Sequence, residues 1–281
     1  MLNISNIRET IELLYDSKTT NSGSEFRHLF GQFIDGLNSG LIRAAEYHDG
    51  EWQVNNWVKK GILLGFRYGK LKDYSSDKLF SYFDKETIPL KPLTINDNVR
   101  VVMGGSSVRT GAYVASGVVI MPPGYINIGA YVDKETMIDS HALVGSCAQI
   151  GKRVHLSAGA MIGGVLEPIG SMPVIVEDDV FIGGNCGIYE GVIVKSGAVL
   201  GSGTILTSSV PVFDIFNERI LRATSNHPLT IPENAVLVPG SRPLQKSGFA
   251  GQNGLHLNCP VIIKYRDDST RDATLLEVSL R

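Results

Sequence analysis

A carboxylate and a hydroxyl lie eighteen residues apart in this chain, at Asp139 and Ser157. A carboxylate close to an attacking nucleophile can act as the general base that removes its proton. His141 follows Asp139 by two residues, so its imidazole could tune that base or take part in proton transfer. The alternatives are structural, because Asp139 could accept backbone N–H bonds at a turn and a lone histidine is often simply hydrogen-bonded. Whether Asp139 and Ser157 act together depends on the fold that spaces them.

The elements that would position these residues are visible as a ladder of aliphatic side chains. From residue 102 to residue 162 every sixth residue is aliphatic, in the series Val102, Val108, Val114, Ile120, Ile126, Val132, Ile138, Val144, Ile150, Leu156 and Ile162. After a break at Pro168 the ladder resumes two residues out of phase, at Val176, Ile182, Ile188, Val194, Leu200, Leu206 and Val212. A period of six fits neither an α-helix nor a flat β-sheet, whose periods are about 3.6 and 2. It is the signature of a parallel β-helix built from hexapeptides, with one short strand in each.

Three hexapeptides would make one triangular coil, so residues eighteen apart should stack on successive coils, about 4.8 Å apart. This register puts Asp139 next to Ser157 on one edge of the prism. The segment VLEPIGSMPVIV carries the phase shift, and we interpret it as a two-residue insertion that loops out from one corner. A loop on a rigid scaffold is a common place for function.

Composition restricts the classes of function. The 281 residues include 43% hydrophobic and 19% charged residues, which indicates an ordered protein with a substantial core. A formal net charge of −2 argues against nucleic acid or an anionic membrane as a partner. The N-terminus does not look like a signal peptide, and no apolar run approaches the length of a membrane span. Three cysteines suggest reduced thiols, so we expect a cytoplasmic protein.

Several familiar catalytic motifs are absent from the sequence. It contains no GxxxxGK[ST] phosphate loop, no CxxC pair, no HExxH motif and no GxSxG elbow. A nucleophilic cysteine would need a neighbouring base that lowers its pKa. Nothing around Cys147 requires such a role, so we expect it to be a small residue packed at a coil position. We predict no metal site.

Residues 1–98 lack the ladder and predict a mostly helical cap domain. Helical apolar stripes occur at Ile4, Ile7, Ile11 and Leu14 and at Phe26, Leu29, Phe30, Phe33 and Leu37. Asp49-Gly50 predicts a hairpin turn, and a further amphipathic helix is expected around residues 56–66. A turn-rich stretch, LKDYSSDKLFSYFDKETIPLKP, would link this domain to the β-helix.

The remaining chain divides into two predicted parts. Residues 99–213 form the β-helix domain, and residues 214–281 form a short C-terminal β/α extension. In that extension VLVPG and CPVIIKY are expected to be strands, and STRDATLLEVSLR a terminal helix. The fold class is therefore mainly β, with a helical domain at one end.

The motifs on the ladder resemble one family in particular. The run YINIGAYVDKETMIDSHALVGSCAQIGKRVHLSAGAMIGGVLEP is similar to the core of the 2,3,4,5-tetrahydropyridine-2,6-dicarboxylate N-succinyltransferases, and the similarity extends to LIRAAEYHDGEWQVNNWVKKGILL, RVVMGGSSVRTGAYVASGVVIMP and VEDDVFIG. The resemblance implies a left-handed parallel β-helix and a homotrimer with active sites between neighbouring protomers. It also implies transfer of a succinyl group from succinyl-CoA, as a cosubstrate and not a permanently bound cofactor, in lysine and diaminopimelate biosynthesis.

The resemblance also assigns candidate substrate-binding residues. Asp139, in TMIDS, matches the family's substrate-binding and catalytic aspartate, and Ser157 would lie beside it. The acceptor substrate carries two carboxylates, which arginine pairs with well. Arg100 matches a substrate-binding arginine; Arg109 is a further candidate that could instead be a solvated charge at the rim. Two residues within matching blocks could also donate to the ligand, Asn127 and Ser146.

This sequence departs from the family pattern in two places. His141 stands where the family has tryptophan. Some members carry a further catalytic glutamate three residues before the position of Glu190, where this chain has Gly187. With a two-residue insertion, Glu167 would fall one coil from Gly187 and could supply the missing catalytic carboxylate; alternatively it anchors the corner loop.

The acyl donor suggests a second group of residues. Gly164 and Gly184 would let the pantetheine arm approach the backbone closely. Arg242, Lys246 and Lys264 could meet the phosphates of CoA, although surface cations are often simply solvated.

Three other interpretations stay open. Another hexapeptide CoA-dependent acyltransferase, acting on a sugar or an amino acid, would commonly use a histidine base. A β-helical metalloenzyme of the carbonic anhydrase type would need three histidines around zinc, but His141 and His155 are followed by no third histidine in the β-helix. A non-catalytic trimeric scaffold would bind no acyl-CoA.

Overall fold

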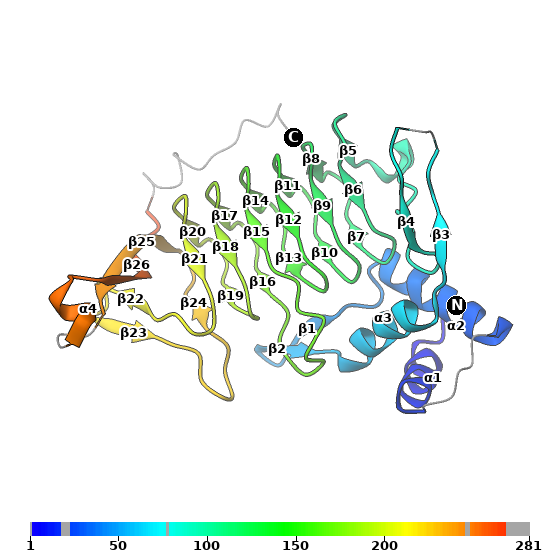
Figure 1. Cartoon of the computed structure of the whole chain (residues 1–281), viewed down its shortest axis with the longest axis horizontal. Helices are drawn as coiled ribbons and strands as arrows, with labels where there is room; N and C mark the ends of the chain where they lie inside the picture. The colour runs from blue at the N-terminus through cyan, green and yellow to red at the C-terminus, as the bar shows by residue number, and fades with distance from the viewer. Residues whose placement is uncertain (1, 18–22, 77–78, 245–247, 268–281) are drawn as a thin grey trace.

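The computed structural model describes residues 2–17, 23–76, 79–244 and 248–267. Figure 1 shows a long stack of narrow coils, with the N-terminal helices beside the first coils and a small lobe at the other end. Within the described residues, no helix is both long and apolar enough to cross a lipid bilayer.

The N-terminal domain contains three helices and one hairpin, as predicted. They are α1 (Ile4–Asp16), α2 (Ser24–Asn38), β1 (Ala45–His48), β2 (Glu51–Val54) and α3 (Asn56–Tyr68). Asp49 and Gly50 form the hairpin turn, with φ of 51° and 87°. The apolar stripes meet in one core, in which Phe33 is completely buried. The apolar residues with helical spacing form helices because the helix places them on one face, which is buried in this core.

The linking stretch contains structure that the sequence did not reveal. A short antiparallel hairpin joins β3 (Leu71–Asp73) to β4 (Phe83–Lys85). A 3₁₀ helix, η1 (Ile95–Asp97), precedes the first coil, and Thr94 and Asp97 form a capping box at its start. Leu93 and Val99 then pack against the end of the coil core.

The coils form a parallel β-helix with three faces. We call face 1 the sheet that contains β5 (Arg100–Val101), β8 (Val119–Ile120), β11 (Met137–Ile138), β14 (His155–Leu156), β17 (Phe181–Ile182) and β20 (Val199–Leu200). Face 2 contains β6 (Ser107–Val108), β9 (Tyr125–Ile126), β12 (Leu143–Val144), β15 (Met161–Ile162), β18 (Gly187–Ile188) and β21 (Ile205–Leu206). Face 3 contains β7 (Tyr113–Val114), β10 (Tyr131–Val132), β13 (Gln149–Ile150), β16 (Ile175–Val176), β19 (Ile193–Val194) and β24 (Thr230–Ile231).

Three corners separate these faces. In the coil of Asp139, corner 1/2 is formed by residues 139–142, corner 2/3 by residues 145–148 and corner 3/1 by residues 151–154. Each strand has two residues, and the second residue points into the core in every strand of the three faces except β5, whose Val101 is exposed. The inward column of face 1 illustrates this arrangement, because Ile120, Ile138, Leu156, Ile182 and Leu200 are all completely buried.

The predicted ladder is confirmed from Val108 onward, but Val102 is out of place. Ile120 pairs with Val101, and Val102 instead donates its backbone N–H to the carbonyl of Ile120. The first coil is one residue longer than a regular coil of eighteen, since Val101 and Ile120 lie nineteen residues apart. A single extra residue in the segment between the strands of that coil explains the shift.

The break at Pro168 is larger than predicted. Ile150 pairs with Val176 across 26 residues, where a regular coil would use 18, so the insertion holds eight residues and not two. Inserting six residues leaves the six-residue spacing of the aliphatic positions unchanged. An insertion of eight residues therefore shifts the ladder by two positions, as an insertion of two residues would. The inserted segment leaves the prism at corner 2/3.

The coil pairing continues beyond residue 213. After an excursion that contains β22 (Val212–Asp214) and β23 (Arg219–Leu221), the chain returns as β24 and β25 (Ala235–Pro243), which pair in parallel with β19 and β20. The strand β25 then pairs with β26 (His256–Tyr265), and α4 (Gly248–Gln252) lies between them. The expected strands VLVPG and CPVIIKY are confirmed, whereas the expected terminal helix lies outside the described residues.

The helical domain was expected to be a cap. It packs along the side of the first coils (Figure 1). Its core includes Ile128 and Cys147, which lie at corner 2/3 of successive coils. Completely buried Lys59 of α3 donates a hydrogen bond to the carbonyl of Ser171 in the inserted segment. The domain therefore fixes corner 2/3 from outside.

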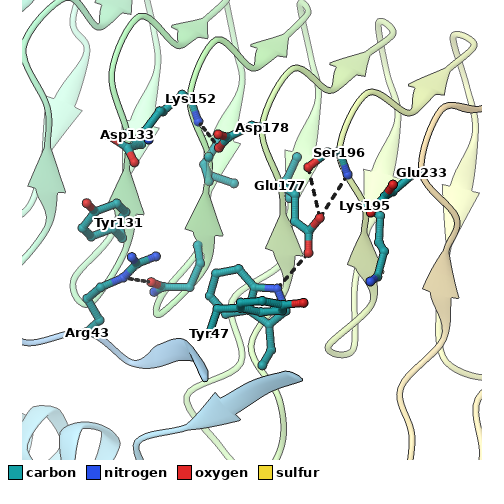
Figure 2. A pocket seen from close by; sticks show the side chains of 15 residues that line it. Arg43, Tyr47, Tyr131, Asp133, Lys152, Glu177, Asp178, Lys195, Ser196 and Glu233 are labelled. Carbon is teal, nitrogen blue, oxygen red and sulfur yellow. Dashed lines mark hydrogen bonds between the residues drawn. The ribbon is translucent and has the colours of Figure 1, made fainter. Parts of the chain in front are cut away.

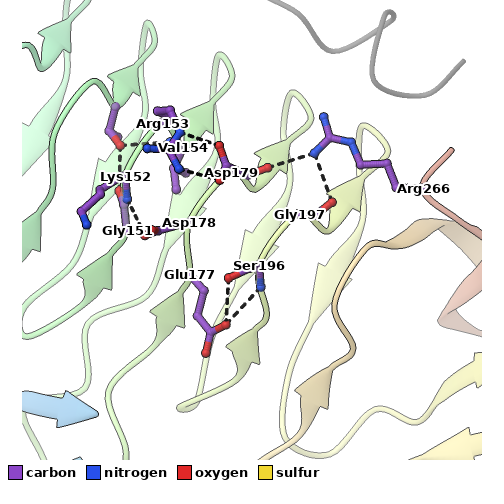
Figure 3. Close-up of polar contacts among 11 residues, drawn as sticks. Gly151, Lys152, Arg153, Val154, Glu177, Asp178, Asp179, Ser196, Gly197 and Arg266 are labelled. Atoms are coloured by element: carbon purple, nitrogen blue, oxygen red, sulfur yellow. Dashed lines mark hydrogen bonds and ion pairs between the residues drawn. The ribbon is translucent and has the colours of Figure 1, made fainter. Parts of the chain in front are cut away.

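Polar contacts connect successive coils at corner 3/1 (Figure 3). Arg153 donates two hydrogen bonds of 2.7 Å to the Asp179 carboxylate. Arg266 donates to the carbonyls of Asp179 and Gly197, at 3.1 and 3.3 Å. This corner is held by charged groups from one coil to the next and by the C-terminal segment.

Asp214 joins three parts of the C-terminal lobe. Its side chain is completely buried and accepts hydrogen bonds from Asn217, Arg219 and the Tyr265 hydroxyl at 2.9, 2.9 and 2.8 Å. Burial alone would raise the pKa of this carboxyl, but the hydrogen bonds outweigh it and the pKa is lowered. The carboxylate is therefore stabilised in its charged form.

This lowered pKa predicts a stability change in acid. Because the folded-state pKa of Asp214 lies below its ordinary value of 3.8, its stabilisation is present above about pH 4 and is lost as the pH falls through the folded pKa. We expect Asp214→Asn to lower the free energy of unfolding by about 1–3 kcal/mol at pH 7, and the difference from wild type to shrink near pH 3. Urea unfolding at both pH values measures it, with exposed Glu51→Gln as the control. A difference that grows in acid would contradict the assignment.

Candidate functional site

Asp139 and Ser157 lie on adjacent coils at corner 1/2, as the eighteen-residue register predicted. The backbone N–H of Asp139 donates to the carbonyl of Leu156 at 2.9 Å. One carboxylate oxygen, Oδ1, accepts a 2.6 Å hydrogen bond from the backbone N–H of Ser140. The carboxylate is half-buried, so it is held by the turn and still accessible from outside the prism.

The histidine that approaches this carboxylate is His155, which the sequence argument did not assign to the site. Its Nε2 lies 4.0 Å from Oδ2 of Asp139, and its side chain is 12% exposed. The ring packs against Phe181, with 5.0 Å between ring centres. His141 instead lies exposed at the turn, with φ of 61°. The eighteen-residue register could have predicted this contact, because it places His155 beside Met137, and Met137 lies two residues before Asp139.

Two further candidates lie along the same corner or the adjoining face. Gly184 follows β17 at corner 1/2, two coils from Asp139, and a side chain there would find no atom closer than 3.4 Å. Exposed Arg100 occupies the outward column of face 1, in which it pairs with Val119, and Val119 pairs with Met137 of the next coil. Arg100, Asp139, Ser157 and Gly184 therefore share one side of the prism.

The other candidates lie at corner 2/3. Asn127 Oδ1 accepts a 2.8 Å hydrogen bond from the N–H of Ile128, and the carbonyl of Ser146 accepts from Val165 at 3.1 Å. A cavity of about 550 Å³ opens beside them on the inserted segment. Its lining comprises Gly163, Gly164, Val165, Glu167, Pro168, Ser171, Tyr189, Glu190 and Ser208.

The predicted stacking of Glu167 against Gly187 is wrong. Gly187 pairs with Met161, because the insertion is eight residues long and shifts Glu167 out of the ladder. Glu167 lies exposed on the cavity wall, where its neighbour Glu190 accepts hydrogen bonds from the N–H and hydroxyl of Ser208 at 2.9 and 2.6 Å. Glu167 and Asp139 lie at different corners, so one chain does not bring the two candidate carboxylates together.

Arg109 is not a solvated charge at the rim. It forms an ion pair with Asp84 of β4, and its guanidinium lies 5.5 Å from the centre of the Phe66 ring. With 12% of its side chain exposed, Arg109 connects the linking hairpin to the first coil.

The candidate CoA-binding cations belong to the C-terminal hairpin. Arg242 lies on β25 opposite Leu257, and Lys264 on β26 pairs with Asp267 at 3.1 Å. Neither residue lines the cavity at corner 2/3. Lys246 lies outside the described residues.

Cys147 is packed as expected. Burial raises the pKa of its thiol to about 12, although the nearby Lys59 cation opposes the shift. The thiol is neutral at ordinary pH and cannot act as an activated nucleophile. Among the described residues there is also no group of three or more His, Cys, Asp or Glu side chains that could hold a metal ion.

A second cavity, of about 490 Å³, lies between the β1–β2 hairpin and face 3 (Figure 2). Arg43 lies 3.7 Å from the centre of the Tyr131 ring and donates a 3.0 Å hydrogen bond to Gln149. Trp52 of β2 donates a hydrogen bond of 3.0 Å to Glu177. These contacts fasten the hairpin to the prism, away from corner 1/2.

Comparison with protein families gives two matches. The family model described as "Tetrahydrodipicolinate N-succinyltransferase N-terminal" matches residues 6–68, which include α2, α3 and all but the first two residues of α1. The model described as "Hexapeptide repeat of succinyl-transferase" matches residues 173–208 of the β-helix.

Individual relatives match over nearly the whole chain. A protein of Nitrobacter hamburgensis is 39% identical and one of Bradyrhizobium diazoefficiens 40% identical, each with 100% of both chains covered. A protein of Azoarcus sp. is 43% identical over 260 residues, with 91% of this chain and 89% of the relative covered. All three are named 2,3,4,5-tetrahydropyridine-2,6-dicarboxylate N-succinyltransferase. With matches of this identity along its full length, the chain belongs to the 2,3,4,5-tetrahydropyridine-2,6-dicarboxylate N-succinyltransferase family.

Proposed function

We propose that this protein transfers a succinyl group from succinyl-CoA to the amine derived from tetrahydrodipicolinate, in lysine and diaminopimelate biosynthesis. The observation that carries the proposal is the full-length similarity of about 40% to N-succinyltransferases, together with the half-buried Asp139 on their shared β-helix. In keeping with the family resemblance, the β-helix is taken to be left-handed. The enzyme is taken to work in the cytoplasm.

The chemistry requires one base and a site for the acyl group. The amine nitrogen attacks the thioester carbon, its proton passes to the Asp139 carboxylate, and the carbon–sulfur bond breaks to release the CoA thiolate. The hydrogen bond from Ser140 leaves Oδ2 of Asp139 directed toward His155 and the outside. Ser157, one coil away, can donate its hydroxyl to the substrate.

Substrate recognition requires cations for two carboxylates. Arg100 is the proposed partner of one carboxylate, because it is exposed on the side of the prism that carries Asp139. Arg109 is less suited to this role because it already pairs with Asp84. Asn127 and Ser146 are proposed to donate to the ligand from corner 2/3.

CoA is proposed as a cosubstrate that runs along the coils. Gly164 and Gly184 are exposed or half-buried at two corners, where the absence of a side chain permits close approach of the pantetheine arm. Arg242 and Lys264 remain proposed phosphate contacts from the C-terminal hairpin.

A homotrimer would complete the site. Asp139 lies at corner 1/2, whereas the cavity with Glu167 lies at corner 2/3. The outward column of face 2 includes the half-buried apolar side chains of Tyr125, Leu143 and Met161, and contiguous exposed apolar residues favour contact with a partner. A neighbouring protomer on this face could bring its own corner 1/2 next to the cavity.

The trimer predicts the mass in solution. Three chains of 30.4 kDa should give about 91 kDa by light scattering. A monomer of about 30 kDa with full succinyltransferase activity would remove the need for a site shared between protomers.

The proposed reaction predicts the effect of replacing Asp139. In a thiol-release assay with succinyl-CoA and tetrahydrodipicolinate, Asp139→Asn should lower kcat by roughly 10²–10⁴-fold, because it removes the base. The matched control is Asp133→Asn, since Asp133 also accepts a hydrogen bond from the next backbone N–H but lies at corner 3/1. Normal turnover by Asp139→Asn would exclude Asp139 from the mechanism. An active Asp139→Ala with an inactive His141→Ala would favour a histidine-dependent acyltransferase.

If Arg100 binds a carboxylate of the acceptor, replacing it should change the KM of that substrate only. Loss of a charged hydrogen bond of about 1.5–3 kcal/mol should raise KM for the dicarboxylate by roughly 10–100-fold in Arg100→Ala, and leave KM for succinyl-CoA nearly unchanged. Arg153→Ala, at corner 3/1, serves as the control. Equal changes in both KM values would argue for a structural role of Arg100.

A further inference from the structure

Gly187 stands out in the outward column of face 2. This column consists of the first residues of paired strands, namely Ser107, Tyr125, Leu143, Met161, Gly187 and Ile205. Gly187 alone among them lacks a side chain, and yet it is buried whereas the other five are not. Another group must therefore cover its backbone.

The covering group is the side chain of Tyr189. A Cβ atom at position 187 would lie 2.8 Å from the Tyr189 hydroxyl oxygen, and one at Gly163 would lie 2.8 Å from Cδ1 of the same ring. Both distances are too short for ordinary carbon contacts, so the ring can lie there only because both positions are glycine. Tyr189 consequently turns back across face 2, and its hydroxyl occupies the space that a side chain at position 187 would have taken.

The Tyr189 side chain also borders the cavity at corner 2/3. Tyr189 lines that cavity together with Gly164, Glu167 and Glu190, and its side chain is half-buried. Within the described part of the chain, the Tyr189 hydroxyl makes no hydrogen bond with another residue. The Glu190 carboxylate, in contrast, is already bonded to Ser208. Tyr189 thus offers an available O–H donor on face 2, beside the cavity that Gly164 also lines.

We propose that Tyr189 is a catalytic hydrogen-bond donor to the thioester carbonyl oxygen of the acyl donor. This inference rests on the proposed succinyl transfer. The phenol O–H of tyrosine can donate a hydrogen bond to an oxygen that becomes negative, which an ionised carboxylate cannot do.

As the carbon–nitrogen bond forms, the carbonyl π electrons move to oxygen, and the oxyanion accepts the hydrogen bond from Tyr189. When the carbonyl reforms, the carbon–sulfur bond breaks and its electron pair leaves with CoA sulfur. The amine proton goes to the base, and Tyr189 keeps its own. In the proposed trimer, base and donor come from neighbouring protomers, because Asp139 and Tyr189 lie at different corners of one chain.

The test is Tyr189→Phe in the full-length protein, assayed by thiol release with succinyl-CoA and tetrahydrodipicolinate. Removing one preorganised oxyanion donor costs roughly 10²–10³-fold in kcat, and KM for both substrates should stay within about twofold. The matched control is Tyr47→Phe, since Tyr47 is exposed on the β1–β2 hairpin and does not line the cavity at corner 2/3. Unchanged kcat in Tyr189→Phe would overturn the proposal, as would a loss expressed only in KM.

A second variant tests the placement of the ring. Gly187→Ala puts a Cβ against Tyr189 and should displace its hydroxyl, so kcat should fall although the tyrosine is still present. Full activity in a folded Gly187→Ala, checked by circular dichroism, would contradict the assigned position. Wild-type protein that releases no thiol would refute the succinyl transfer itself, whereas active wild type with an active Tyr189→Phe refutes the role of Tyr189 alone.

Discussion

The structure depends on the burial of one aliphatic side chain in every hexapeptide. Ile138, Leu156 and Ile182 stack in one completely buried column, while their backbones form hydrogen bonds to the coils before and after. Strands of two residues cannot satisfy their own backbone polar groups, so each coil is stable only next to its neighbours. The interior is therefore closed to chemistry, and functional groups are restricted to corners and outward positions.

The same constraint decides what the sequence could predict. A strict period of six and a coil of eighteen residues were sufficient to place Asp139 beside Ser157, and they also contained the position of His155. They failed at Glu167, because a ladder of period six shows only how far an insertion exceeds a whole number of hexapeptides. The eight inserted residues looked like two, and Met161 took the place beside Gly187 that had been assigned to Glu167.

Contacts between parts of the chain far apart in sequence were not predictable from the pattern. The helical stripes of the N-terminal domain show that it has a buried face, but not which side of the prism buries it. Ile128 and Cys147 complete that core, and buried Lys59 reaches the inserted segment. The pairing of Arg109 with Asp84 likewise depends on the linking hairpin, whose partner strands carry no strong sequence signal.

Gly187 shows why a functional role cannot be transferred one residue at a time. Compared with the family pattern at this position alone, Gly187 marks a missing carboxylate. In the folded chain, the same glycine allows Tyr189 to turn back over face 2, because a side chain at either Gly163 or Gly187 would collide with the ring. The space above a strand, and not the residue number, determines which group faces the substrate. A neutral donor in that space also suits a cavity that already contains the carboxylates of Glu167 and Glu190, since a third negative charge would oppose the developing oxyanion.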